Sequence, residues 1–191
     1  MASTKPGERK LQILQTLASM LENPKGEKIT TAALAAKVEV SEAALYRHFA
    51  SKAQMFEGLI EFIESSIFGL INQISDQQED GLLQAQAIIH MLLNFAEKNP
   101  GMTRVLIGDV LVNEDDRLQL RMNQLAERIE MAFRQSLRLA ASQGRLPETE
   151  AAARASMLCS FILGRWMRFA KTGFKQLPTD QAAIQIAMLL R

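Results

Sequence analysis

The chain has 191 residues, of which 48% are hydrophobic, and its formal net charge at neutral pH is +1. This length suits one large domain, or a small domain joined to a larger one, with enough apolar side chains for a sizeable core. A single cysteine, Cys159, excludes an internal disulfide, and neither a secretory signal nor an apolar span of membrane length is found, so we expect a soluble, cytoplasmic protein.

The charge is distributed unevenly along the chain. Residues 1–52 hold eight Lys and Arg against five Glu, a net charge of +3, whereas the remaining residues hold 14 basic against 16 acidic side chains, a net charge of −2. A basic N-terminal part suits contact with phosphate groups, and the acidic remainder suits a different partner.

The first predicted helix covers about residues 8–23. It carries an apolar face formed by Leu11, Leu14, Leu17, Ala18 and Leu21. The segment before it shows no periodicity, and the sequence Asn-Pro-Lys-Gly after it predicts the end of the helix.

Residues 29–52, ITTAALAAKVEVSEAALYRHFASK, predict two short helices joined by a tight turn and followed at once by a third. Thr30 or Thr31 begins the first of these helices, and Ser41 begins the second, because their side-chain oxygens can accept from unpaired backbone N–H groups. Helices this short must dock on another element, which indicates a helix-turn-helix with its second helix presented to a DNA major groove. Glu39 stands at the turn position where a left-handed conformation favours glycine.

The outward residues of this stretch predict DNA contacts. Small side chains let a helix approach base edges, while Tyr, Arg, His and Lys can reach phosphates. The predicted DNA-binding residues are Thr31, Ser41, Ala43, Ala44, Tyr46, Arg47, His48 and Lys52. The alternative is an ordinary helical hairpin whose polar side chains are merely solvated.

The rest of the chain predicts further helices and no strand, so the fold class is all-α with about nine helices. Ser51 begins a long helix to about residue 75, and Asp80-Gly81 begins one to about residue 98 that is apolar on nearly every side. A short helix to about Leu111 and three more at about 116–142, 148–171 and 181–191 follow, the residues 113–116 and 178–180 acting as caps. We expect a DNA-binding head in residues 1–52 and a helical body in residues 53–191.

The last two predicted helices are unusually rich in small and apolar residues. Terminal helices with such wide apolar faces commonly pack against a second pair, which predicts a four-helix interface in a homodimer. The residues expected there are Phe161, Trp166 and Ile186. The alternative is that these helices simply cover the core.

Little in the sequence indicates an enzyme. His48 and His90 are far apart, no Cys or carboxylate spacing suggests a metal site, and no glycine loop or nucleophile motif is present. The acidic residues 114–116 precede a helix, where capping explains them. We therefore expect no catalytic residue, metal or cofactor.

Residues 29–52 resemble the head of TetR-type regulators, and four longer segments resemble the nucleoid occlusion factors within that class. The segments are SEAALYRHFASKAQMFEGLIEFIE, NPGMTRVL, EDDRLQLRMNQLAERIE and RFAKTGFKQLPTD. The resemblance implies a homodimer that lies on the nucleoid, binds specific chromosomal sites and, once bound, antagonises polymerisation of the tubulin-like division protein FtsZ.

The same resemblance implies a binding groove for the C-terminal tail of FtsZ between the fourth and fifth helices. The matching positions are Phe62, Asn94, Lys98 and Asn99, with Met91 nearby. A ligand-responsive transcriptional repressor on the same fold is the alternative, and it would need a roomy body cavity with several polar anchors. A purely structural helical protein is a third interpretation, which the capped head disfavours.

Overall fold

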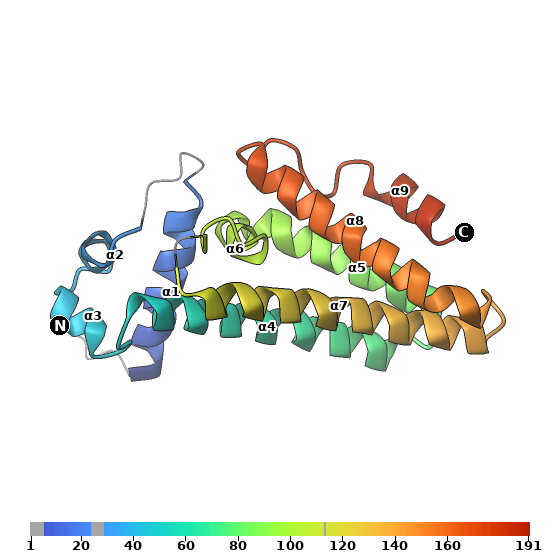
Figure 1. Ribbon diagram of the computed structural model, residues 1–191, viewed down its shortest axis with the longest axis horizontal. Helices are drawn as coiled ribbons and strands as arrows, with labels where there is room; N and C mark the ends of the chain where they lie inside the picture. The colour runs from blue at the N-terminus through green and yellow to red at the C-terminus, as the bar shows by residue number, and fades with distance from the viewer. Residues whose placement is uncertain (1–5, 24–28, 113) are drawn as a thin grey trace.

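The computed structural model describes residues 6–23, 29–112 and 114–191, and every regular element within these ranges is helical (Figure 1). The predictions for residues 1–5, 24–28 and Asn113 fall outside them. The elements are α1 (Pro6–Leu21), α2 (Thr31–Lys37), α3 (Glu42–Tyr46), α4 (Lys52–Gln77), α5 (Gly81–Lys98), α6 (Pro100–Leu106), α7 (Asp116–Ser142), the short 3₁₀ helix η1 (Glu148–Glu150), α8 (Ala151–Lys171) and α9 (Ala182–Leu189). The all-α prediction is confirmed.

Local capping sets most of the helix starts as predicted. The hydroxyl of Thr30 accepts from the backbone N–H of Ala33, and that of Ser51 accepts from the N–H of Gln54. The Asp80 carboxylate accepts from two N–H groups in the first turn of α5. Each cap satisfies backbone donors that would otherwise have no partner, so these starts follow from the local sequence.

The predicted limits of three helices are corrected. The first helix covers Pro6–Leu21 rather than residues 8–23, and α6 ends at Leu106 because Gly108 takes a positive φ of 75° and turns the chain. The predicted cap at residues 178–180 is wrong: Gln181, in a left-handed conformation, precedes α9 and makes no side-chain cap. The Thr179 hydroxyl instead donates to the Glu97 carboxylate.

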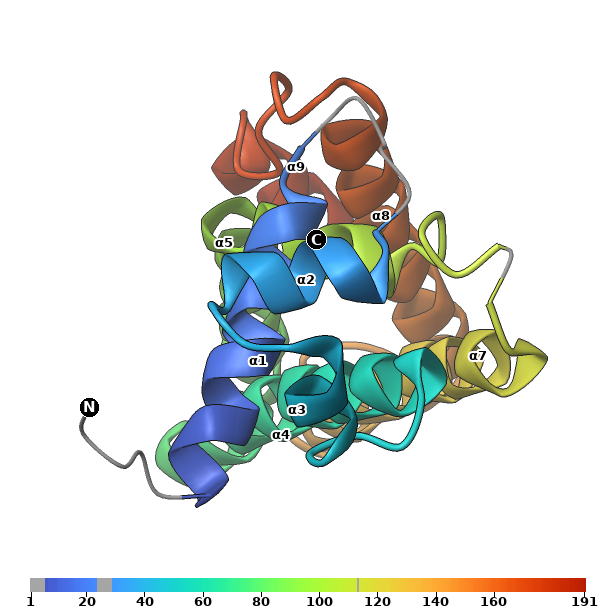
Figure 2. The same ribbon diagram turned by 90° about the vertical axis from the view of Figure 1, so that its left-hand side faces the viewer.

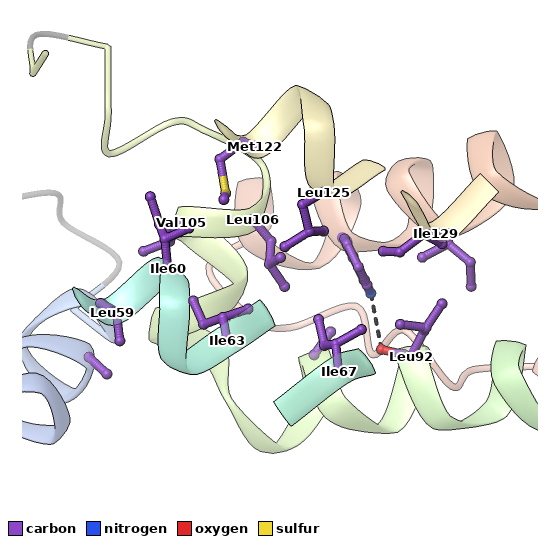
Figure 3. Packing of buried hydrophobic residues seen from close by; sticks show 14 of the residues in the cluster. Leu59, Ile60, Ile63, Ile67, Leu92, Val105, Leu106, Met122, Leu125 and Ile129 are labelled. Atoms are coloured by element: carbon purple, nitrogen blue, oxygen red, sulfur yellow. Dashed lines mark hydrogen bonds between the residues drawn. The ribbon is translucent and has the colours of Figure 1, made fainter. Parts of the chain in front are cut away.

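The body is built from four long helices that lie alongside one another. Figure 1 shows α4 running from the head along the length of the body, with α5 and α7 beside it and α8 packed against α5 and α7. Their facing side chains interdigitate in the core (Figure 3). Trp166 is fully buried there, and its indole N–H donates to the backbone oxygen of Leu92 at 3.1 Å, which ties α8 to α5.

The head consists of α1, α2 and α3 together with the start of α4, and Figure 2 views the molecule from this end. It is joined to the body by a close approach of α1 and α6. A Cβ on Gly101 would overlap the carbonyl oxygen of Ala18, so only glycine fits. The Arg104 guanidinium donates to the carbonyl oxygens of Leu21 and Asn23 at 3.3 and 3.1 Å, which supplies partners at the C-terminus of α1.

We therefore predict that Gly101→Ala lowers the free energy of unfolding by about 2 kcal/mol or more, because the added methyl group forces α1 and α6 apart. Gly69→Ala in α4 is the matched control, since a Cβ there meets nothing within 4 Å and should be neutral or stabilise by up to about 1 kcal/mol. Urea unfolding of both variants measures the difference. Equal stability of the two variants would contradict the close packing of α1 on α6.

Candidate functional site

The recognition helix α3 is held in place by three local features. The Ser41 hydroxyl accepts from the N–H of Ala44 at 3.1 Å, and Leu45 is fully buried against the rest of the head. The preceding turn is closed by a 3.0 Å hydrogen bond from the N–H of Val40 to the oxygen of Ala35. Glu39 has φ 59°, so the predicted left-handed conformation is confirmed. The strained residue lies at the turn between α2 and α3.

The predicted DNA-binding residues in and beside α2 and α3 are all at least partly accessible. Ser41, Ala43, Tyr46 and Arg47 are exposed, while Thr31, Ala44 and His48 are half-buried. A short polar chain joins the two helices here: the Tyr46 hydroxyl donates to Thr31 Oγ1 at 3.5 Å, and Thr31 donates to the Glu42 carboxylate at 2.8 Å.

Glu42 is missing from the predicted set, although its carboxylate is part of this polar chain. It lies in the first turn of α3, where an acidic side chain stabilises a helix in any case, so no sequence pattern marks it as a contact residue. A carboxylate at this point could accept a hydrogen bond from a cytosine amino group in a major groove.

A cationic cleft of about 360 Å³ lies beside the recognition helix. It is lined by Arg9 of α1 together with Arg47 and His48, and by the apolar residues Ile13, Val40 and Ala44. Arg9 belongs to a different helix, so only the packing of α1 against the helix-turn-helix could reveal this grouping. The two arginines place positive charge beside the recognition helix, and positive charge is what a phosphate backbone attracts.

Lys52 is not a free cation in this structure. Its ammonium group forms an ion pair with the Glu114 carboxylate and lies 5.6 Å from the centroid of the Phe56 ring. The two charged side chains are only 24% and 14% exposed. Their separation in sequence meant that no local pattern could indicate the pair.

The residues expected to bind the partner tail come from two neighbouring antiparallel helices. Phe62 is partly exposed on α4, and Asn94 and Lys98 are exposed on α5, while Met91 and Asn99 are half-buried. Phe62 on α4 and Ala96 on α5 are the same number of residues away from the turn that joins the two helices, so they lie at the same height along the pair. Asn94 and Lys98, two residues before and after Ala96, therefore lie just above and just below the height of Phe62.

Both asparagine amides are already engaged in this region. The side-chain N–H₂ of Asn94 donates to the oxygen of His90, and that of Asn99 donates to the oxygen of Phe95, each at 2.7 Å. Their amide oxygens are the atoms left to receive a hydrogen bond from a peptide.

The structure corrects two of the residues expected at a dimer interface. Trp166 and Ile186 are 0% and 1% exposed within a single chain, so neither offers a surface to a second copy. Phe161 is half-buried. An apolar helix pattern does not reveal which of its faces is covered by its own chain. The exposed apolar side chains of α8 and α9 are Met157, Met167, Ile184 and Met188.

No group of three or more potential metal-ligating side chains is found in the part of the chain that the structure describes. Within the same residues, no helix is long and apolar enough to cross a membrane. Burial raises the pKa of the Cys159 thiol to about 11, and its Sγ donates to the oxygen of Ala126, which suits the buried apolar role predicted for it.

The N-terminal part matches the model described as "Bacterial regulatory proteins, tetR family" over residues 27–59, and residues 79–191 match the SlmA-like "Tetracyclin repressor-like, C-terminal domain". The chain is 50% identical over 182 residues to the nucleoid occlusion factor SlmA of Alteromonas mediterranea, covering 95% of this chain and 93% of that protein. It is also 50% identical over 179 residues to SlmA of Idiomarina loihiensis, with 93% and 91% covered.

Among solved structures, the fatty acid degradation regulator FadR from Bacillus halodurans superposes with a TM-score of 0.79 at 13% identity, covering 94% of this chain and 96% of that one. A TetR-family transcriptional regulator from Agrobacterium tumefaciens gives a TM-score of 0.78 at 20% identity, with 97% of each chain covered. At these identities the likeness concerns the fold.

The turn before α3 generates a prediction about stability. Glu39→Gly should raise the free energy of unfolding by about 0.5–1 kcal/mol, because glycine adopts a positive φ without the cost that a Cβ brings. Glu39→Ala removes the same carboxylate but keeps the Cβ, and should give no such gain. Thermal unfolding of the two variants separates backbone strain from charge, and a gain shared by both would contradict the strain.

Proposed function

The chain belongs to the SlmA family of nucleoid occlusion factors, and from this premise we propose that it inhibits FtsZ assembly when bound to chromosomal DNA. It is a DNA-binding regulator with a TetR-type head rather than an enzyme. The observation that carries the proposal is the 50% sequence identity to SlmA proteins over almost the whole length of the chain. The identity in the body matters most, because the head alone is common to many regulators.

For DNA, we propose that residues 1–52 act as the binding head and residues 53–191 as the body. Tyr46, Arg47, His48 and Lys52 would contact the duplex, with Ser41, Ala43, Ala44 and Thr31 around them. Support comes from the exposed face of α3 and from the cationic cleft that includes Arg9. Through this contact the protein would lie on the nucleoid in the cytoplasm.

For FtsZ, we propose that its C-terminal tail binds along α4 and α5 near Phe62, Met91, Asn94, Lys98 and Asn99. An aromatic side chain that stays partly exposed on α4 is a suitable apolar anchor. The exposed ammonium of Lys98 suits an acidic peptide.

We also propose a homodimer formed by the outer faces of α8 and α9. Ile184 and Met188 lie one turn apart on α9 and are each 66% exposed, and Phe161 is half-buried on α8. Two copies of such a face would remove this apolar area from water, and a two-fold dimer would place two heads on one duplex.

A ligand-responsive repressor remains the second candidate, since the fold neighbours include regulators of fatty acid metabolism. Against it, the core of the body is filled by large side chains, among them Phe133 and Trp166, which are each 0% exposed. A ligand there would have to displace them and break the hydrogen bond from Trp166 to Leu92.

The first functional prediction separates the two surfaces. Tyr46→Ala should weaken DNA binding about tenfold or more through loss of a hydrogen bond to phosphate, and Phe62→Ala should leave DNA binding unchanged. Phe62→Ala should instead weaken the inhibition of FtsZ assembly, since an anchor of this kind carries about 2 kcal/mol or more.

Sedimentation of FtsZ polymers in the presence of DNA measures the second effect. Leu120→Ala, which truncates an exposed leucine on α7, is the control and should behave as wild type. A wild-type protein that binds DNA normally without affecting FtsZ would reject the proposal and favour the repressor.

The second prediction concerns the dimer. Ile184→Asp combined with Met188→Asp should give folded monomers, because it places charges on an apolar interface while leaving the protomer core intact. Leu120→Asp makes the same change on an equally exposed leucine of α7 and should remain dimeric. Light scattering gives the mass, and circular dichroism reports the fold. A folded wild-type monomer at micromolar concentration would refute the interface.

A further inference from the structure

The ion pair between Lys52 and Glu114 joins the start of α4 to the segment just before α7. Glu114 directly precedes Asp115, the N-cap of α7. Asp115 is occupied by Arg117, whose guanidinium contacts both carboxylate oxygens at 3.0 and 2.8 Å and lowers the pKa of that carboxyl to about 2. Among the described acids at this end of α7, Glu114 is therefore the one that neutralises Lys52.

The ion pair engages the ammonium group of Lys52, which the proposed function assigns to DNA. A lysine ammonium has three donors but one charge, so a phosphate held by Lys52 would lie beside the Glu114 carboxylate. Two anions at one ammonium repel each other, and the pair is shielded enough from water for this repulsion to be felt. Either the carboxylate leaves Lys52 or DNA affinity is lost.

We propose that Glu114 is an internal competitor of DNA phosphate, which must displace it from Lys52 when the head binds a duplex. The Phe56 ring keeps the ammonium near the start of α4 during the exchange, since this contact does not involve Glu114. The inference rests on the proposed function in one respect, which is that Lys52 reaches a phosphate.

The replacement of Glu114 by a DNA phosphate at Lys52 would couple DNA binding directly to the body. Three charged contacts fasten α4 to the first part of α7: Lys52 to Glu114, Arg117 to Glu57 at 3.7 Å, and Arg121 to Glu64 at 2.7 Å. Displacing Glu114 releases the contact nearest the DNA. By linkage, any partner that moves the start of α7 away from α4 must also raise the affinity of Lys52 for phosphate.

The test measures the affinity of four proteins for a duplex of mixed sequence: wild type, Glu114→Gln, Lys52→Ala and the double variant. Glu114→Gln keeps the size of the side chain and removes the competing charge, so affinity should rise about fivefold, the scale of a partly exposed ion pair. In the Lys52→Ala background the same change should raise affinity less than about twofold, since only general repulsion between Glu114 and DNA remains.

Asp116→Asn is the matched control, because it removes an exposed acid two residues away that is not the ion-pair partner of Lys52. It should change affinity less than about twofold. The thermal midpoint of the DNA-free Glu114→Gln protein should fall slightly while its DNA affinity rises, whereas a purely structural glutamate would lower both.

The outcomes distinguish the two proposals. If Glu114→Gln fails to raise affinity, or raises it equally with and without Lys52, or no more than Asp116→Asn does, the competition is refuted. In the Glu114→Gln background, Lys52→Ala should also make the salt dependence of binding shallower by about one unit. If affinity and salt dependence there do not change, Lys52 does not contact phosphate, and the proposed role of Lys52 fails instead.

Discussion

The burial of one face of α4 is the interaction on which the rest of the structure depends. Its side chains Met55, Phe56, Leu59, Ile60, Ile63, Ile67 and Ile71 are at most 4% exposed, and they belong to one cluster with the buried residues of head and body. The burial of this apolar area holds α4 firmly against both the head and the body. Because α3 leads into α4 through Ser51, the recognition helix is oriented by the same core that holds the body.

With its α4 anchored in this way, the head depends on local rather than overall charge to meet DNA. A net charge of +1 gives the whole molecule little long-range attraction for a polyanion. The positive groups beside the recognition helix are gathered by packing, because α1 brings Arg9 to the same cleft as Arg47. Lys52, by contrast, is neutralised by Glu114. The affinity for DNA then depends on which cationic side chains are free to meet phosphate, so the single carboxylate of Glu114 has a large influence on it.

Features that depend on neighbouring residues could be predicted from the sequence, and those that depend on distant ones could not. The caps at Thr30, Ser41 and Ser51 and the left-handed Glu39 follow from local backbone requirements. The partner of Lys52 could not be found this way, because Glu114 is brought to it only by the folded body. Periodicity likewise marked α8 as apolar without showing that Trp166 faces its own core. At Thr179, a hydrogen bond to Glu97 prevailed over local capping chemistry.

The burial of Trp166 also bears on how the two proposed protein surfaces relate to each other. Its hydrogen bond to Leu92 locks α8 onto α5 at the residue that lies between Met91 and Asn94. The indole is surrounded by core side chains, so α8 cannot slide along α5 without losing both packing and that bond. The outer face of α8, where a second copy would pack, and the residues of α5 that would receive a peptide therefore belong to one rigid unit. This unit contacts the head through Gly101 with Ala18, Arg104 with α1, and Glu114 with Lys52, so a change at the head reaches both surfaces through the same rigid body.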